Sequence, residues 1–458
     1  MVGSAVRKPV QQQVYAGKVQ TVNVQRTRLA FFALCCYLAS QAVGIPVKAF
    51  GPSWAVWPTL SDIAVAIMAV SILNGYWRFR VTSRANNEIF QGLLLILGGT
   101  VLVFFFMYMR NTIVSIGGSD KSMSTGMFQI YHLTQFVFIF WVTAGIPLTD
   151  SRLKLLSRLV DIVLLIVFAG VIGTYFSIIN TRQLISHLPY TAVAGPWSAL
   201  YDRQMSEIGL VGYNHAYTAL QLIMLTSLAL HLRPKAGLLA ESAYLLMCMA
   251  GVVMSGSRAG MAAALIFIAA HLIRKPGTLV TVFAVTVLLS IVGGGVLYSQ
   301  NANFSESMDR LMSLKKPTEP DSLSGRTDIW RESFAFIQED PVRWLIGAGP
   351  GSVAQQGYNA HMLYLQIVME AGIVGLCIFG FVFLKVIKYL YRVEKGTKPI
   401  LYATLVFLIS SFTQETFYPV PALGHFLGLY LCSLAIALRF NPNCKHSPHP
   451  TKLEVRYI

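Results

Sequence analysis

The sequence predicts an all-α protein that crosses a membrane about twelve times, and its composition and apolar runs support that prediction. Hydrophobic residues make up 55% of the 458 residues and charged residues only 12%, which is about half the charged fraction of a soluble domain. Apolar runs of about 17–25 residues recur along the chain, the length that crosses the hydrocarbon core as a helix. Because a backbone inside lipid must satisfy its own hydrogen bonds, these runs are expected to be helical.

The apolar runs place the spans and divide the chain. The spans cover about 29–46, 60–77, 89–109, 126–146, 159–179, 215–232, 238–254, 260–273, 278–298, 361–384, 400–417 and 424–438. The chain is therefore expected to comprise a polar tail (1–28), nine helices (29–298), a large loop (299–360), three helices (361–438) and a second tail (439–458).

The net charge of +16 follows from membrane topology and does not call for a nucleic-acid partner. About two-thirds of the lysines and arginines lie in the tails and in short loops on one side, which is the cytoplasmic side by the positive-inside rule. The loop 299–360 lies on the other side. It holds six basic and eight acidic residues, and long loops cross largely regardless of charge. We therefore expect both termini inside and no binding of nucleic acid.

The external loop is expected to carry two helices that lie over the outer face of the membrane. Trp330, Phe334 and Ile337 form an apolar stripe at helical spacing. An earlier stripe consists of Phe304, Met308, Leu311 and Met312. Amphipathic stripes of this kind favour the interface with membrane lipids.

External arginines are the first candidates for chemistry. Arg258 follows the seventh span in the small-residue turn 255–260, on the side where the positive-inside rule disfavours it. A guanidinium fork at that depth suits phosphate oxygens, although snorkelling or helix capping also explains an interfacial arginine. Arg326, Arg310 and Arg203 are the other external arginines of interest. Acidic neighbours of Arg326 also permit a simple solvated ion pair.

His361 is the candidate general base, because it opens the tenth span directly after the polar loop. Neutral imidazole accepts a proton from an attacking hydroxyl near neutral pH, while packing or capping is the plainer interpretation. The preceding Gly347–Gly351 turn lacks the lysine of a phosphate-binding loop and follows no strand. Glu370, within the same span, is either functional or hydrogen-bonded to a neighbouring helix. Four other histidines lie near the outer face: His132, His187, His215 and His425.

No Asp-x-Asp pair, of the kind that metal-held diphosphate chemistry would use, appears in the external segments. The first external loop, 47–59, has no Asp or Glu, and Asp62 is the single possibility close to it. No serine–histidine–aspartate order or nucleotide-binding loop stands out. We therefore expect a reaction without metal or cofactor, in which arginines neutralise the charge.

Taken in order, the polar motifs resemble those of the O-antigen ligase and polymerase superfamily. They are Ser257-Arg258-Ala259-Gly260, Gly325-Arg326 with Trp330, Pro341 with Gly347-x-Gly349, His361-Met362-x-Tyr364-Leu365 and Glu370-x-Gly372. The series covers residues 250–380, and the topology extends the resemblance to nearly the whole chain. Members often carry asparagine after the histidine, where this chain has Met362, and that departure bears on the subfamily.

The resemblance implies a glycosyltransferase of the bacterial inner membrane with a GT-C-like arrangement of helices and an active site facing the periplasm. It implies that Arg258 and Arg326 hold the pyrophosphate of an undecaprenyl-linked glycan, with Arg203 or Arg310 assisting. His361 is then expected to orient or deprotonate the acceptor hydroxyl, with inversion at the anomeric carbon.

The position of the large loop favours a ligase that uses lipid A–core as acceptor. A polymerase or a protein O-oligosaccharyltransferase of the same superfamily is the alternative. A flippase or exporter of lipid-linked glycan is a further alternative of another class. Transporters place polar residues at the midplane, whereas here they gather at one face, which favours an enzyme.

Overall fold

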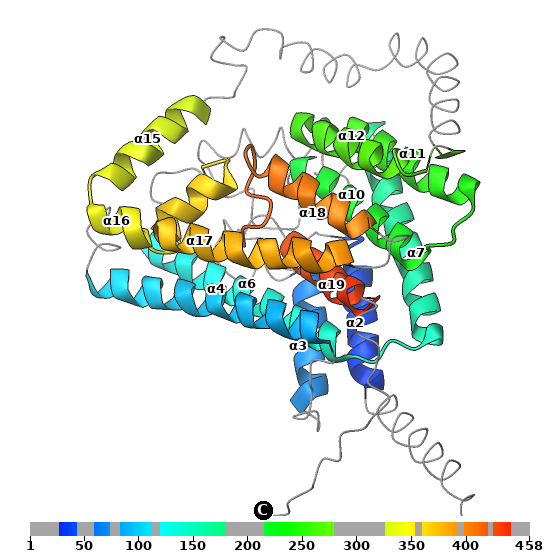
Figure 1. Ribbon diagram of the computed structural model, residues 1–458, viewed down its shortest axis with the longest axis horizontal. Helices are drawn as coiled ribbons and strands as arrows, with labels where there is room; N and C mark the ends of the chain where they lie inside the picture. Colours follow the sequence, from blue (N-terminus) through cyan, green and yellow to red (C-terminus); the bar gives the residue numbers. More distant parts are fainter. Residues whose placement is uncertain are drawn as a thin grey trace, which may run out of the picture.

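The computed structural model describes residues 27–43, 59–73, 83–110, 120–176, 178–179, 215–275, 277–278, 326–352, 360–392, 398–419 and 425–440. Within these ranges the regular elements are helices (Figure 1). They are α2 (Arg28–Ser40), α3 (Leu60–Leu73), α4 (Arg84–Met109), α6 (Asp120–Gly145), α7 (Asp150–Tyr175), α10 (His215–Leu232), α11 (Leu238–Met254), α12 (Arg258–Leu272), α15 (Arg326–Gln338), α16 (Pro341–Ile346), α17 (Leu363–Arg392), α18 (Pro399–Ser410), α19 (Phe426–Ala437) and the short 3-10 helix η5 (Leu438–Phe440).

The predicted class, an all-helical polytopic membrane protein, is confirmed. Four helices are long and apolar enough to cross a membrane: α4, residues 125–145 of α6, α7 and α17. Seven shorter apolar helices of 10–17 residues coincide with further predicted spans, namely α2, α3, residues 216–232 of α10, α11, α12, α18 and α19. The ninth predicted span, 278–298, lies outside the described residues except for its first position, so the number twelve stays a prediction.

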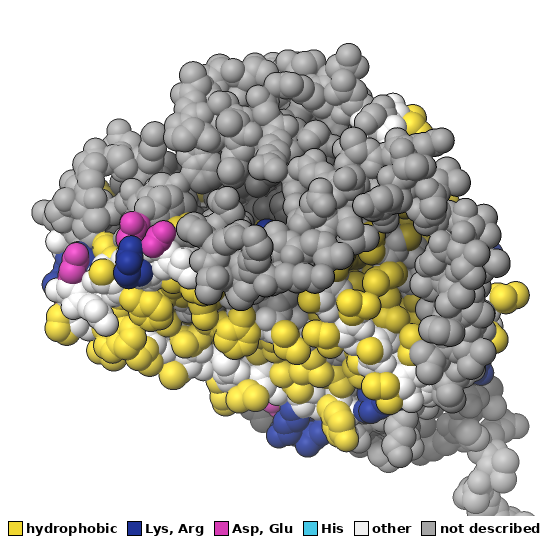
Figure 2. All heavy atoms as spheres, turned by 90° about the horizontal axis from the view of Figure 1, so that it is seen from above, with side chains coloured by type: hydrophobic (Ala, Val, Ile, Leu, Met, Phe, Trp, Pro, Cys, Tyr) yellow, Lys and Arg dark blue, Asp and Glu magenta, His cyan; other side chains and the backbone are white. Residues whose placement is uncertain are grey.

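A broad apolar surface surrounds the helices. On α4, the side chains of Leu95, Leu102 and Phe105 are all more than half exposed. Figure 2 shows hydrophobic side chains spread widely over the described part of the face it draws, with most of the acidic side chains at the end where Figure 1 places α15 and α16, and basic side chains both there and along the lower edge of the view. A soluble monomer rarely exposes so large an apolar patch, so this surface is the one that lipid is expected to cover.

Two helices are enclosed by the others. Every residue of α19 is buried, and α10 packs against α7, α11, α12, α18 and α19. Outside this centre, α17 lies along α4, and α4 lies along α6 (Figure 1). Gly428 lets α19 approach α2, since a Cβ there would lie 2.2 Å from the hydroxyl oxygen of Tyr37. The described parts of α10 and α19, 18 and 12 residues long, therefore contact protein on all sides.

Gly372, the tenth of the 30 residues of α17, breaks this helix, a feature that hydropathy did not predict. Its φ is 67°, and it lies so close to α16 that a Cβ would be 2.2 Å from the carbonyl oxygen of Leu345. The Gly347–Gly351 turn fills the break, and its N–H groups donate to the carbonyls of Met369 and Glu370 at 2.7 and 3.1 Å. Carbonyls at a helix end need such partners. The glycine-rich turn therefore caps the part of α17 that precedes Gly372.

The later part of the external loop is helical, as predicted, but one side chain of the expected stripe points elsewhere. Ile337 is buried, whereas Phe334 is 45% exposed and Phe336 is buried in its place. The cause is α16, which packs against α15 and places the Arg343 guanidinium 4.3 Å from the Phe336 ring. The stripe in 304–312 lies outside the described residues.

Helix α18 ends at Ser410, seven residues before the predicted end of its span at residue 417. The hydroxyls of Ser411 and Thr413 donate to carbonyls of the last turn of α18, at 2.7 and 3.0 Å. Such local bonds compete with the helix. The segment that follows turns back to the start of α17, where the Leu363 N–H donates to the Ser411 carbonyl at 2.9 Å. This turn brings Glu415 to the beginning of α17.

Candidate active site

His361 occupies an unusual backbone position just before α17. Its φ is +50°, in the left-handed region that residues other than glycine rarely adopt and that is enriched at functional sites. Its N–H donates to the carboxylate of Glu415. The preceding residue, Ala360, accepts a hydrogen bond from the indole of Trp330 at 2.8 Å and donates one to Gln366 at 3.1 Å. Three parts of the chain therefore hold a histidine whose side chain is still 40% exposed.

Glu415 is the candidate that the sequence analysis missed. Its side chain is only 4% exposed, and its Oε1 lies 3.6 Å from Nδ1 of His361. Tyr217 on α10 donates to the backbone carbonyl of Glu415 at 3.2 Å. A signal was present in the sequence, because an acidic residue inside the run predicted as span 400–417 is a functional candidate by default.

Arg326 begins α15 and reaches the same segment. Its Nη1 donates to the backbone carbonyl of Thr413 at 2.9 Å. Burial lowers the pKa of the Arg326 guanidinium, Glu415 opposes this effect, and the positive charge of Arg258 lowers the pKa further. The arginine nevertheless stays charged near neutral pH, because its unperturbed pKa is so high. Arg326 therefore lies within electrostatic reach of both the buried carboxylate and a second arginine.

The packing of α12 on α10 brings Arg258 to the end of the bundle where Glu415 and Arg326 lie. A Cβ at Gly260 would lie only 2.4 Å from the Cβ of Ala219, so the first turns of the two helices are in close contact. Ala219 is two residues from Tyr217, which bonds to Glu415. The first residue of α12 is therefore near the carboxylate, in agreement with its effect on Arg326, and its side chain is partly buried.

Three further residues were predicted from the sequence as candidates for the site: Arg203, Arg310 and Glu370. Arg203 and Arg310 lie outside the described residues. Glu370 is buried, and its Oε1 accepts hydrogen bonds from the Gly351 N–H at 3.3 Å and from Gln366 at 3.0 Å. Through these contacts Glu370 holds the glycine turn against α17.

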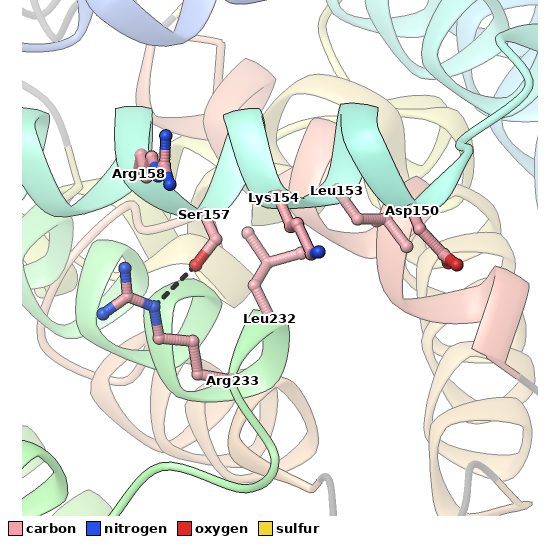
Figure 3. Close-up of a pocket in the computed structure, with 7 residues that line it drawn as sticks. All are labelled: Asp150, Leu153, Lys154, Ser157, Arg158, Leu232 and Arg233. Atoms are coloured by element: carbon pink, nitrogen blue, oxygen red, sulfur yellow. Dashed lines mark hydrogen bonds between the residues drawn. The ribbon is translucent and has the colours of Figure 1, made fainter.

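A pocket of about 400 Å³ lies at the opposite end of α10. Its lining is Asp150, Leu153, Lys154, Ser157, Arg158, Leu232 and Arg233, and Figure 3 shows the Arg233 Nε donating to the Ser157 hydroxyl at 2.7 Å. Arg233 follows Tyr217 by 16 residues, and a helix of that length is about 24 Å long. The pocket is therefore separate from Glu415, and its basic lining agrees with the predicted cytoplasmic side.

The residues around Glu415 combine a potential base with two cations. An imidazole beside a carboxylate can take a proton from a hydroxyl, and guanidinium groups can neutralise phosphate oxygens. Among the residues that the structure describes, one group of side chains could hold a metal ion, and it includes none of these four residues. The arrangement therefore suits a transfer reaction with an anionic leaving group.

Comparisons with known proteins point in the same direction. Residues 243–380 match the family model described as O-antigen ligase. The matched segment includes Arg258, Arg326 and His361 and ends before Glu415. The comparison with curated proteins finds no match.

Proposed function

We propose that this multi-pass membrane protein is a glycosyltransferase of the bacterial inner membrane, and the match of residues 243–380 to the O-antigen ligase family model supports this proposal. Its donor is a glycan on undecaprenyl pyrophosphate, and its acceptor is lipid A–core, as in lipopolysaccharide biosynthesis. The observation that carries the proposal is one imidazole–carboxylate pair with two arginines at one end of the bundle. These residues are His361, Glu415, Arg258 and Arg326.

His361 acts as the general base. In its neutral form it takes the proton of the acceptor hydroxyl while the hydroxyl oxygen attacks the anomeric carbon. Glu415 fixes the backbone of His361 by accepting its N–H, and its negative charge stabilises the imidazolium that forms. A carboxylate next to a catalytic imidazole has this role in other transferases and hydrolases.

The arginines act on the leaving group. The bond that breaks joins the anomeric carbon to a phosphate oxygen, and its electron pair departs with undecaprenyl pyrophosphate. Arg258 and Arg326 stabilise the charge that develops there, and Arg203 and Arg310 are proposed to assist. In-line attack inverts the anomeric centre. Since the guanidinium groups supply the positive charge, the step uses no metal ion.

The active site is proposed to face the periplasm. The external loop of the predicted topology contains α15, which delivers Arg326 and Trp330 to the site. The opposite ends of α7 and α10 carry Lys154, Arg158 and Arg233, and basic residues of this kind are typical of the cytoplasmic side.

A transfer assay with purified protein in detergent tests the proposal. The donor carries a labelled oligosaccharide, and lipid A–core, a second lipid-linked repeat and a pilin-like protein are offered as separate acceptors. Label on lipid A–core supports a ligase. Label on the repeat or on the protein supports the polymerase or the protein transferase instead. Movement of the glycan across vesicles without any transfer would identify a flippase and contradict the proposal.

A matched pair of histidine variants ties the assay to the site. His361→Ala should abolish transfer. His271→Ala should not, because His271 pairs with Glu241 at the other end of α12, 13 residues or about 20 Å from Arg258. Equal transfer by the two folded variants would remove His361 from the mechanism.

A further inference from the structure

Three buried side chains from α3, α6 and the start of α19 bring metal-ligating atoms together. Asp62, His132 and His425 each offer one such atom, and these atoms all lie within 4.8 Å of one another. We propose that they bind a divalent transition-metal ion, with zinc as the first candidate. The site goes beyond the proposed sugar transfer, because it contains none of the residues assigned to that reaction.

The spacing of the ligand atoms fits a tetrahedral ion. Nε2 of His425 lies 3.2 Å from Oδ1 of Asp62. Two ligands of tetrahedral zinc, each about 2.0–2.1 Å from the metal, are about 3.3 Å apart. The Asp62–His425 pair is therefore already at the spacing of two ligands. A movement of at most about 1.5 Å at His132 completes three protein ligands, because no two of the ligand atoms are more than 4.8 Å apart, and water can take the fourth position.

The ring nitrogens of His132 have no hydrogen-bond partner in the described part of the chain. The residue is 1% exposed, and neither Nδ1 nor Nε2 has a hydrogen-bond partner there. Its neighbours are aromatic, with the ring centroids of Phe128 and Phe136 at 4.7 and 5.6 Å. Leaving a buried polar group without a partner costs free energy. A metal ion bound to one of the two nitrogens removes part of that cost.

Asp62 is held as ligating carboxylates commonly are. The backbone N–H and the hydroxyl of Thr59 both donate to Oδ2 at 2.8 Å, so Oδ1 is the oxygen that faces His425. Gln135 on α6 donates to Oδ1 at 3.1 Å. Such outer hydrogen bonds orient a carboxylate toward a metal.

The donor atoms select the class of ion. Two imidazole nitrogens and one carboxylate oxygen suit zinc, copper, nickel or iron, whereas magnesium and calcium prefer sites made of oxygen. Zinc is favoured among these ions because it readily takes four ligands in tetrahedral geometry.

The ion has a structural role in this proposal. It joins α3, α6 and α19, whose ligands come from distant parts of the chain. His425 follows Glu415 by ten residues, so the ion also anchors the connection from α18 to α19 that carries the carboxylate of the candidate active site.

Metal content of the full chain, purified without a histidine tag, is the first measurement. After incubation with zinc and removal of unbound ion, the wild type should retain one zinc ion per chain. His132→Phe and Asp62→Asn should each retain at least about 10-fold less. With cobalt(II) as the probe, only the wild type should show the strong visible absorption of a tetrahedral site. A wild type that retains no more zinc than the variants, and lacks this absorption, overturns the proposal.

Thermal stability gives an independent measurement. If the site binds an ion, the wild type should melt above His132→Phe in the presence of that ion; if it binds none, the variant should melt above the wild type. Zinc should raise the Tm of the wild type by several degrees and leave that of the variant unchanged. If no ion binds, phenylalanine removes two unpaired nitrogens from an aromatic cluster, and the variant should melt above a wild type that zinc does not affect. That second result also overturns the proposal.

His361→Ala is the control for both measurements. It removes a histidine of the candidate active site, and it should bind zinc as the wild type does. Since zinc binding is measured without the transfer reaction, either the metal site or the proposed function can fail without the other.

Discussion

Replacing Glu415 with glutamine tests whether the buried carboxylate supports proton removal by His361. Glutamine has nearly the same volume and keeps an oxygen that can accept the His361 N–H, so the backbone of the site should be retained. The variant loses the negative charge beside the imidazole. It therefore separates the electrostatic contribution of Glu415 from its positional one.

The expected magnitude follows from the distance of 3.6 Å between Nδ1 of His361 and Oε1 of Glu415. A charge pair at that distance interacts by about 4.6 kcal/mol at an effective dielectric constant of about 20, and by about 1.2 kcal/mol in water. Because the His361 side chain is 40% exposed, solvent screens the charge pair. We therefore expect an interaction energy of about 2 kcal/mol between the imidazolium and the carboxylate. That value corresponds to a decrease of about 30-fold in kcat.

Steady-state transfer with purified protein measures the effect. The KM for the lipid-linked donor should stay the same or fall, because Arg326 loses an anionic neighbour that competes with pyrophosphate. Glu241→Gln is the matched control, since Glu241 is also a buried carboxylate beside a histidine, but it lies in the first turn of α11 and pairs with His271 in the last turn of α12, far from Arg258. It should leave kcat unchanged. A folded Glu415→Gln protein with kcat within about twofold of the wild type would refute the role of the carboxylate.

Four further predictions concern Gly372, Arg258, His361 and Ser322. Gly372→Ala should lower the free energy of unfolding by at least about 2 kcal/mol, because φ is 67° and the new Cβ would meet a carbonyl oxygen at 2.2 Å. Gly380→Ala in the same helix, with no atom within 4 Å, should be close to neutral, so equal thermal unfolding of the two variants would contradict the packing argument. Arg258→Lys keeps the charge but loses the guanidinium fork, and it should weaken donor binding and slow transfer about 100–1,000-fold. His361→Gln should leave donor binding intact while slowing transfer, and the opposite pattern would exchange the two roles. Ser322→Cys, in the external loop, should react with a membrane-impermeant thiol reagent in spheroplasts, and its protection would overturn the topology.

Hydropathy and charge were sufficient to predict the class of the fold. A segment that lies in lipid must be apolar and must pair its own backbone groups, so composition alone marks it as a helix. The run 238–254, for example, coincides with α11, because the polar turn around Pro234 precedes it and the turn at Gly256, with φ of 70°, follows it. The same polar interruptions located Arg258 and His361, since each stands at the edge of an apolar run, and Arg326, which lies in the polar loop between two runs.

The neighbours of those residues were decided only by the tertiary structure. Every span is apolar, so the hydrophobic pattern does not distinguish a face that meets lipid from one that meets another helix. The choice depends on shape, as where Gly260 admits Ala219. It also depends on local polar bonds, such as those that end α18 early. For that reason the sequence by itself predicted that His361 stands at the end of a membrane span, and only packing placed Glu415, 54 residues later, at its side.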